Sequence, residues 1–307
     1  MLSPSIETSA LLDAQQELQT VRDLLRWSVS QMNRCGVAFG HGSDNAWDEA
    51  AYLLLHTLHL PLDTLDPYLD ARVLRSEREQ FLALIARRCN ERLPAAYLTG
   101  EAWLQGHRFR VTPDTIVPRS PIAELLSEQL QPWIADPDAV YSALDLCTGT
   151  GCLAILTALA FPQAQVDAVD LSDAALAVAQ SNIDDFGLSE RVTLHKSDLL
   201  DQLPDAAYDL IICNPPYVNE SSMQALPAEY VHEPRLALAG GEDGMDLVRR
   251  ILDAAPDFLA PNGVLVLEIG HEYDNFLAAF PELDPVWLST ETAEDQILLL
   301  TREQLAP

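Results

Sequence analysis

The sequence predicts an α/β protein with a parallel, doubly wound sheet, preceded by a small helical domain and a hairpin-like connector. From about residue 140, apolar runs typical of buried strands alternate with segments of helical spacing, which is the order of elements in a parallel sheet. Residues 1 to about 92 show helical spacing without strand alternation. We therefore expect a helical domain over residues 1–105, a connector over 106–122 and the α/β domain over 123–307.

The helical domain is predicted from three stretches in which apolar residues recur on one helical face. These stretches are 9–34, 45–59 and 75–92. In the third, Ser76 is followed three residues later by Glu79, which resembles a capping box that opens the helix. The connector is predicted as a hairpin, because RFRVT and TIVPR flank Pro113-Asp114 and turn residues between two such runs favour that structure.

The α/β domain is predicted from the order of its strands and helices. The expected strands are 139–147, 165–171, 191–199, 208–217, 263–270, 285–290 and 296–301. The expected helices are 151–161, 173–188, 245–259 and 273–280. In doubly wound sheets ligands bind beyond the carboxyl ends of the strands, at the point where the strand order reverses. Site residues are therefore expected directly after the predicted strands.

The composition is strongly acidic, with 47 Asp and Glu against 18 Lys and Arg and a formal net charge of −29. This charge suits either a solubility surface or the attraction of a basic partner, and it opposes direct binding of bare nucleic acid, which needs a basic footprint. The N-terminus lacks the pattern of a signal peptide, and no apolar run approaches the roughly 18–20 residues of a membrane span. The five cysteines form no CxxC pair, which predicts reduced thiols in a cytoplasmic protein and no zinc site.

A glycine-rich turn follows the first strand of the α/β domain and predicts a cofactor site. Its candidate binding residues are Asp145, Thr148, Gly149, Thr150 and Gly151. The glycines allow a ligand to approach the backbone, and the following helix N-terminus offers free N–H groups. Asp170 comes about 20 residues later, after the next strand, where a carboxylate accepts hydrogen bonds from ribose hydroxyls. At this point NAD and S-adenosylmethionine both remain possible.

Asp198 and Leu199, at the end of the third strand, are candidates for the adenine side of the same cofactor. The carboxylate is suited to bind the edge of the ring and the leucine side chain to pack against its face. Taken alone, Asp198 is equally suited to cap a helix or a turn.

The most specific motif is Asn214-Pro215-Pro216-Tyr217, directly after the apolar strand that ends at Cys213. Two prolines fix the backbone and hold the preceding residue in an extended conformation, so the Asn214 side chain points in a defined direction. Its oxygen and the backbone carbonyl of Pro215 are suited to accept hydrogen bonds from the two N–H groups of a planar amino group. Tyr217 is suited to pack on that group. We interpret the four residues as catalytic, with alignment and electrostatics as their contribution.

These motifs resemble the class I amino methyltransferases, which include DNA adenine enzymes and protein glutamine methyltransferases. The segments 44–50 and 92–98 resemble the helical substrate-recognition domain of the glutamine enzymes. Val117-Pro118-Arg119-Ser120-Pro121 and His232-Glu233-Pro234 resemble their connector and their post-catalytic loop. The resemblance implies a Rossmann-like domain with a seven-stranded sheet. It also implies S-adenosyl-L-methionine as cofactor, S-adenosyl-L-homocysteine as product and no metal.

Within the glutamine enzymes, two departures favour one branch. The release-factor branch usually continues Pro-Arg with Pro, an acidic residue and Thr, whereas this chain has Ser120-Pro121-Ile122. That branch usually reads Asp-Leu-Gly in the first turn, whereas this chain has Cys147 in place of the glycine. Both features resemble the branch that methylates large-subunit ribosomal protein L-three. A basic ribosomal protein, free or in a pre-ribosomal particle, is therefore the expected partner.

Four alternatives use some of the same features. A release-factor glutamine methyltransferase shares all the motifs outside the two departures. A DNA or RNA adenine methyltransferase needs the same Asn-Pro-Pro-Tyr motif, but it must also neutralise phosphates. An NAD-dependent dehydrogenase would use the glycine-rich turn and would have no use for Asn214. An assembly factor without activity would not need Asp170 and Asn214 together.

Overall fold

The structure is a computed structural model that describes residues 4–204 and 206–306. The chain forms two compact units. The first consists of Met1–Ala102 together with Pro227–His232, and the second of Trp103–Leu226 with Glu233–Pro307. The first unit thus takes up a short segment that lies far along the chain, within the α/β region.

The first unit is helical, as expected. Its helices are α1 (Thr8–Glu17), α2 (Val21–Cys35), α3 (Ala46–Thr57), α4 (Arg75–Asn90) and α5 (Ala95–Thr99). The stretch 9–34, which has helical spacing, forms two helices, because the chain breaks between α1 and α2. There Thr20 caps α2: the Asp23 N–H donates to Thr20 Oγ1 (3.1 Å) and the Thr20 N–H to Asp23 Oδ2 (3.0 Å). A reciprocal cap of this kind starts a new helix.

Helix α4 begins at Arg75, the first residue of the predicted stretch, but its cap is Leu74 and not the predicted Ser76. Ser76 lies inside the helix, so it does not form a capping box with Glu79. The Leu74 N–H instead donates to Glu77 Oε2 at 2.8 Å. Because Glu77 already satisfies the first free N–H group, the helix begins at Arg75 without a cap from the serine.

A buried ion-pair cluster holds Pro227–His232 within the helical unit. Arg88 on α4 is fully buried; its Nε lies 2.6 Å from Glu49 Oε1 and its Nη1 3.1 Å from Glu229 Oε1. The third guanidinium nitrogen donates to the carbonyl of Ala38 at 2.6 Å. The Ala38 N–H in turn donates to Glu229 Oε1 at 3.0 Å. Buried charges need partners of this kind, so the cluster fixes this segment in the unit.

The hairpin lies earlier than predicted. Strands β1 (Glu101–Leu104) and β2 (His107–Arg110) pair in a two-stranded sheet. Their two-residue turn has positive φ at both Gln105 (48°) and Gly106 (74°), as the favoured hairpin turns require. The expected strand at TIVPR does not form. There the Val117 N–H donates to Glu233 Oε1 (2.9 Å), a side-chain partner in place of a neighbouring strand.

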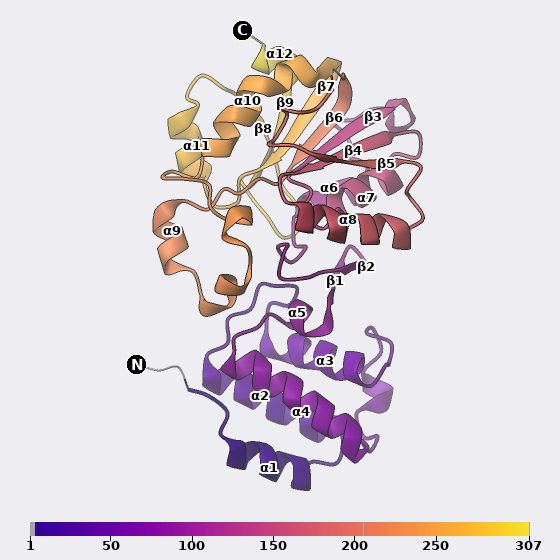
Figure 1. The fold of residues 1–307 in the computed structure, drawn as a ribbon, viewed down its shortest axis with the longest axis vertical. Coiled ribbons are helices and arrows are strands. Elements are labelled where there is room, and N and C mark those ends of the chain that lie inside the picture. The colour runs from indigo at the N-terminus through magenta and orange to yellow at the C-terminus, as the bar shows by residue number, and fades with distance from the viewer. Residues whose placement is uncertain (1–3, 205, 307) are drawn as a thin grey trace. The chain divides into compact units, whose positions relative to one another are not determined.

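The second unit contains the predicted seven-stranded sheet. Its strands are β3 (Ser142–Leu146), β4 (Gln165–Asp170), β5 (Val192–Lys196), β6 (Tyr208–Cys213), β7 (Leu259–Glu268), β8 (Val286–Leu288) and β9 (Ile297–Thr301). They lie in the order β5-β4-β3-β6-β7-β9-β8, and Figure 1 shows helices on both faces. The fold class is confirmed. One strand departs from a fully parallel sheet, because β9 runs antiparallel to both β7 and β8.

Alternation along the strands divides the core of this unit between the two faces of the sheet. Ala143 and Leu210 belong to the cluster that contains α6 (Ile122–Ser127) and α7 (Cys152–Ala160). Their neighbours Leu144 and Ile211 belong to the opposite cluster, which contains α10 and α11. The remaining helices are α8 (Asp173–Asp185), α9 (Glu220–Ala225), α10 (Asp246–Phe258), α11 (Tyr273–Ala279) and α12 (Arg302–Leu305). None of the helices in the described part of the chain is long and apolar enough to cross a bilayer.

Candidate active site

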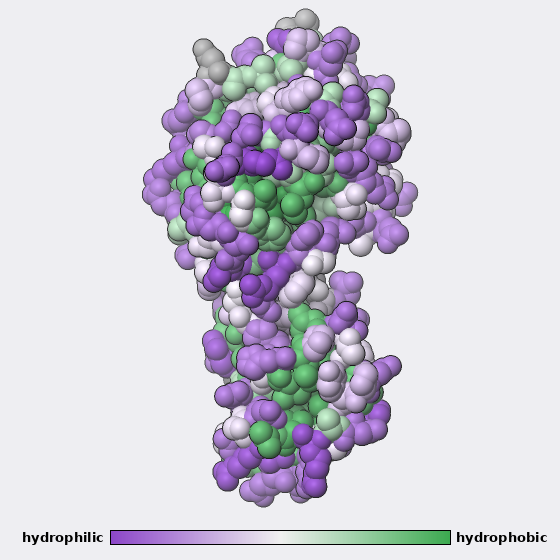
Figure 2. Space-filling model, turned by 90° about the vertical axis from the view of Figure 1, so that its right-hand side faces the viewer, coloured by the Kyte–Doolittle hydropathy of each residue, from purple (hydrophilic) through white to green (hydrophobic). Residues whose placement is uncertain are grey.

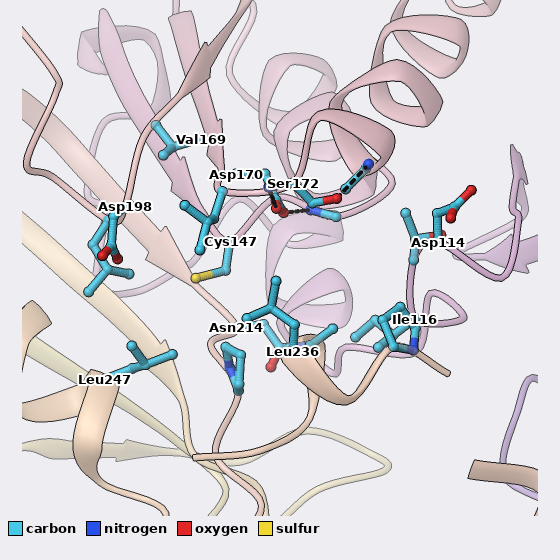
Figure 3. Close-up of a pocket in the computed structure, with 18 of the residues that line it drawn as sticks. Asp114, Ile116, Cys147, Val169, Asp170, Ser172, Asp198, Asn214, Leu236 and Leu247 are labelled. Carbon is cyan, nitrogen blue, oxygen red and sulfur yellow. Dashed lines mark hydrogen bonds between the residues drawn. The ribbon is translucent and has the colours of Figure 1, made fainter. Parts of the chain in front are cut away.

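A cavity opens in the second unit, beyond the carboxyl ends of β3, β4 and β6. Figure 3 shows Cys147, Asp170, Asp198 and Asn214 directed around it from different strand ends. Six of the predicted site residues line it: Gly149, Asp170, Asp198, Leu199, Asn214 and Pro216. The position between β3 and β6 is where the strand order reverses, as the fold rule predicts.

Asp170 is bound to the glycine-rich turn across the cavity floor. Its Oδ2 accepts the Gly149 N–H and its Oδ1 accepts the Ser172 N–H, both at 2.9 Å. Burial raises the pKa of the Asp170 carboxyl, against these two hydrogen bonds, which lower it. Each oxygen retains capacity for a further donor, so the carboxylate is suited to bind ligand hydroxyls while it holds the turn.

The other predicted residues of the turn lie beneath it. Asp145 is buried and accepts hydrogen bonds from Thr148 Oγ1 (2.6 Å) and the Ala154 N–H (3.0 Å). Burial raises the pKa of Asp145 to about 7. The Thr150 carbonyl accepts from Asn182 Nδ2 at 2.8 Å. These contacts support the shape of the turn, and a direct role of these residues in binding stays a prediction.

Three positions of the turn, Cys147, Gly149 and Gly151, adopt the left-handed backbone region. Gly151 has φ of 77°, and a side chain there would place its Cβ 3.1 Å from Ala179 Cβ, so the glycine permits close packing of α7 on α8. Cys147 has φ of 60°, a region that costs a residue with a side chain about 1–2 kcal/mol. The chain accepts this conformation, and the cysteine lines the cavity.

Asp198 and Leu199 line the cavity on the side of α10. The Asp198 carboxylate pairs with Arg250 Nη1 at 3.0 Å, and its side chain is about half exposed. Leu199 is buried and has φ of 53°. Leu199 therefore offers an apolar surface to the cavity. The surface ion pair leaves a second acceptor oxygen on Asp198, so its predicted contact with the cofactor stays open to test.

Asn214 directly follows β6, and the pairing of Leu146 with Cys213 places it beside the glycine-rich turn. Among the described residues its side-chain amide has no hydrogen-bond partner, although it is half-buried at the cavity wall. Pro215 is buried and Pro216 lines the cavity. A half-buried amide without a protein partner, held by two prolines, is available to a ligand.

Tyr217 is held from two sides and does not line the cavity. Its hydroxyl donates to Glu268 Oε1 at 3.0 Å. Its ring packs so closely on Gly270 that a Cβ there would lie 2.3 Å from Tyr217 Cε2. Packing of Tyr217 on a planar substrate group stays a prediction. Glu268 was not predicted, although it is the one charged residue in the apolar run 263–269, and that pattern could have indicated it.

A loop after the catalytic motif closes another side of the cavity through Pro234, Leu236 and Ala237. It is held at Glu233, whose two oxygens lie 2.6 and 2.8 Å from Arg119 Nη1 and Nη2. The motifs that contain Arg119 and Glu233 were noted in the sequence, whereas their pairing was not. The lining residues Asp114, Thr115 and Ile116 were likewise not predicted.

These residues fit an adenosyl cofactor. A carboxylate bound to the glycine turn lies at one side, and the apolar side chains of Val169, Leu171 and Leu199 provide surfaces for a ring. Among residues 4–204 and 206–306, no group of three or more His, Cys, Asp or Glu side chains could hold a metal ion.

Comparisons with known proteins agree with this site. Residues 123–242 match the family model described as methyltransferase small domain. The "ribosomal protein uL3 glutamine methyltransferase" of Bordetella pertussis is 70% identical, covering 94% of this chain and 97% of that protein. Proteins of the same name from Burkholderia pseudomallei and Neisseria meningitidis serogroup B are 58% and 55% identical, covering 94% and 95% of this chain and 96% of each relative. The similarity thus extends over both units.

Proposed function

The chain belongs to the ribosomal protein uL3 glutamine methyltransferase family, and from that premise we propose that it methylates the side-chain amide nitrogen of a glutamine in uL3. The chain is an S-adenosylmethionine-dependent methyltransferase, and the resemblance to the ribosomal-protein branch is confirmed. One observation carries the proposed chemistry. The unpartnered amide of Asn214 lies in the same cavity as Asp170 and Gly149.

For the cofactor, Asp170 is the proposed ribose ligand, and Leu199 the proposed surface for adenine. S-adenosylmethionine supplies an electrophilic methyl group on a sulfonium, and S-adenosylhomocysteine is the product. Asp145, Thr148, Thr150 and Gly151 are proposed to hold the turn in the shape that binding requires, with Gly149 at the cavity itself. Asp198 is proposed to contact the adenine edge with the carboxylate oxygen that Arg250 leaves available.

For the substrate, Asn214 is the proposed orienting group. An amide nitrogen is a weak nucleophile because its lone pair is delocalised into the carbonyl. Asn214 Oδ1 accepts one N–H of the glutamine amide and the carbonyl of Pro215 accepts the other, so the nitrogen is held in one orientation. No base is required before transfer, because the methylated nitrogen becomes strongly acidic and releases its proton to water. The contribution of the protein is then alignment and electrostatic stabilisation.

The proposed partner is uL3 itself, free or in a pre-ribosomal particle, in the cytoplasm. The acidic excess of the chain favours association with a basic protein. The test is incubation of the enzyme with labelled S-adenosylmethionine and purified uL3, followed by mass spectrometry of the labelled peptide. Label on a single glutamine is expected. Label on a release factor alone, or on adenine-containing oligonucleotides, would contradict the proposal.

Asn214→Ala tests the chemistry separately from cofactor binding. Because Asn214 is proposed to orient the reacting nitrogen, its loss should lower kcat about a hundredfold or more, the scale for one preorganised polar contact. The Kd for S-adenosylmethionine should change little in calorimetry. Asn262→Ala, at an exposed position of the same unit outside the cavity, is the matched control. A wild-type kcat in Asn214→Ala would show that the motif is only a rigid turn.

A further inference from the structure

A buried carboxylate lies behind the catalytic motif and is not explained by the proposed chemistry. Glu268 is the last residue of β7, only 3% exposed. Its Oε1 accepts from the Tyr217 hydroxyl (3.0 Å) and its Oε2 from the Ser120 hydroxyl. The two donors are far apart in sequence: Ser120 belongs to the segment before α6, and Tyr217 is three residues after Asn214. Each of the two hydroxyl donors belongs to a motif identified in the sequence: Ser120 to Val117-Pro118-Arg119-Ser120-Pro121 and Tyr217 to Asn214-Pro215-Pro216-Tyr217.

The environment of Glu268 makes it a strong anchor. The Tyr217 ring is pressed against Gly270 on the same segment, so ring and hydroxyl are both held. Asn219, two residues further along the same loop, donates through Nδ2 to Glu272 at 2.8 and 2.9 Å. The end of β7 and the residues after it thus hold the loop at Tyr217 and at Asn219. Of these two loop residues, Tyr217, which Glu268 holds, is the closer to Asn214 in sequence.

We propose that Glu268 is a positioning residue, which acts through Tyr217 to hold the Asn214-Pro215-Pro216 turn in the orientation that methyl transfer requires. Glu268 does not line the cavity, so it is not expected to touch substrate or cofactor. The proposal rests on the proposed role of Asn214. A misplacement of about 1 Å at a reacting group is enough to lower the rate about a hundredfold, which is why an anchor one step removed from the site affects turnover.

The protonation state of Glu268 determines how firmly it holds the Asn214-Pro215-Pro216 turn through Tyr217. As a carboxylate it accepts from both hydroxyls, whereas in the protonated form one oxygen becomes a donor. One of the two hydroxyls must then reorient to accept, and both hydrogen bonds lose the assistance of the negative charge. Burial raises the pKa of Glu268 to about 7, and Arg119 and the two hydroxyls oppose that rise. The other titratable groups that face it are the Cys213 thiol, at the end of β6, and the Tyr217 hydroxyl itself. Protonation on lowering the pH should therefore loosen the motif.

The experiment measures kcat with saturating uL3 and S-adenosylmethionine from about pH 6 to 8.5. In the wild type, kcat should fall as the pH drops through about 7. Glu268→Gln, which keeps the size but not the charge, should lower kcat about tenfold at pH 8 and remove this inflection. The Kd for S-adenosylmethionine should stay within about twofold. Glu282→Gln, at an exposed carboxylate of the same unit, is the matched control and should retain both kcat and the inflection.

Tyr217→Phe provides a second route in case Glu268→Gln does not fold. It removes only the hydroxyl and keeps the ring on Gly270, and it should lower kcat about as much as Glu268→Gln. Because the two variants break the same hydrogen bond, their effects should not multiply in the double variant. A wild-type kcat and pH profile in either folded variant would overturn the positioning role. If Asn214→Ala is still inactive in that case, the proposed function stands and only this inference fails.

Discussion

At the scale of single residues, Asp170 joins two tasks that are usually separate. It holds the glycine-rich turn through Gly149 and Ser172, and it is the proposed ligand of the ribose. Cys147 shows a second residue-scale compromise. It adopts a left-handed backbone, with φ of 60°, where a glycine would meet no steric cost. Its side chain lines the cavity. The unfavourable backbone conformation of Cys147 is thus accompanied by a thiol at the site.

Asp170→Ala should weaken the binding of S-adenosylmethionine about tenfold to a hundredfold, because hydrogen bonds to a charged acceptor contribute about 1.5–3 kcal/mol. Isothermal titration calorimetry measures this directly. Asp173→Ala removes an exposed carboxylate at the start of α8, which pairs with Lys196, and should leave the affinity unchanged. Equal affinity of wild type and Asp170→Ala would refute the assignment, and tight binding of NAD would revive the dehydrogenase alternative.

At the scale of elements, α4 and the segment Pro227–His232 depend on each other within the helical unit. Arg88 is fully buried between Glu49 and Glu229, and Arg92 Nη1 also lies 3.4 Å from Glu229. The segment belongs to the long connection between β6 and α10, which also contains the cavity-lining residues Pro234 and Leu236. The same connection thus contributes Pro227–His232 to the first unit and cavity-lining residues to the second.

Arg88→Met should destabilise the helical unit by about 3–5 kcal/mol, because it leaves buried Glu49 without its cation and Glu229 with Arg92 alone. Amide hydrogen exchange in α4 and in Pro227–His232 is the suitable measurement, since a chain of two units need not unfold in one step. Arg87→Met, one residue earlier, breaks only an exposed pair with Glu91 and should cost about 0.5 kcal/mol or less. Equal protection in the two variants would contradict the role of the buried cluster.

At the scale of the whole molecule, the acidic charge is unevenly distributed. The unit with the seven-stranded sheet holds 32 of the 47 acidic residues and 9 of the 18 basic ones. Figure 2 shows hydrophilic residues over most of the face that it presents. A field of one sign attracts a basic partner over a distance of about one Debye length, and salt screens it.

The kcat/KM for uL3 should therefore fall about tenfold or more between about 0.05 and 0.5 M NaCl, because electrostatic steering acts on association. Steady-state assays across this range measure it. The kcat at saturating uL3 serves as the internal control and should change far less. A kcat/KM that does not depend on salt would show that the acidic surface serves solubility and not substrate capture.

The sequence by itself determined the fold class and the set of strand ends that form the site. Apolar runs marked the seven strands, and the rule that ligands bind beyond their carboxyl ends led to Gly149, Asp170 and Asn214, which line one cavity in the structure. The fold class and the grouping of these residues at one cavity could be inferred because both depend on local patterns and on one topological rule, whereas the roles of the residues stay predictions. Boundaries set by side-chain capping, as at Thr20 and Leu74, were less accurate, because several nearby residues are suited to cap a helix.

Only the tertiary structure decided which distant residues meet. The pairs Ser120–Glu268 and Arg119–Glu233 are 148 and 114 positions apart, and Arg88 meets Glu229 across 141. The antiparallel direction of β9 likewise depends on how the chain returns to the sheet. No local periodicity encodes such contacts. They form because buried charged and hydroxyl groups must find partners once the chain is compact, and the choice among partners is made by packing.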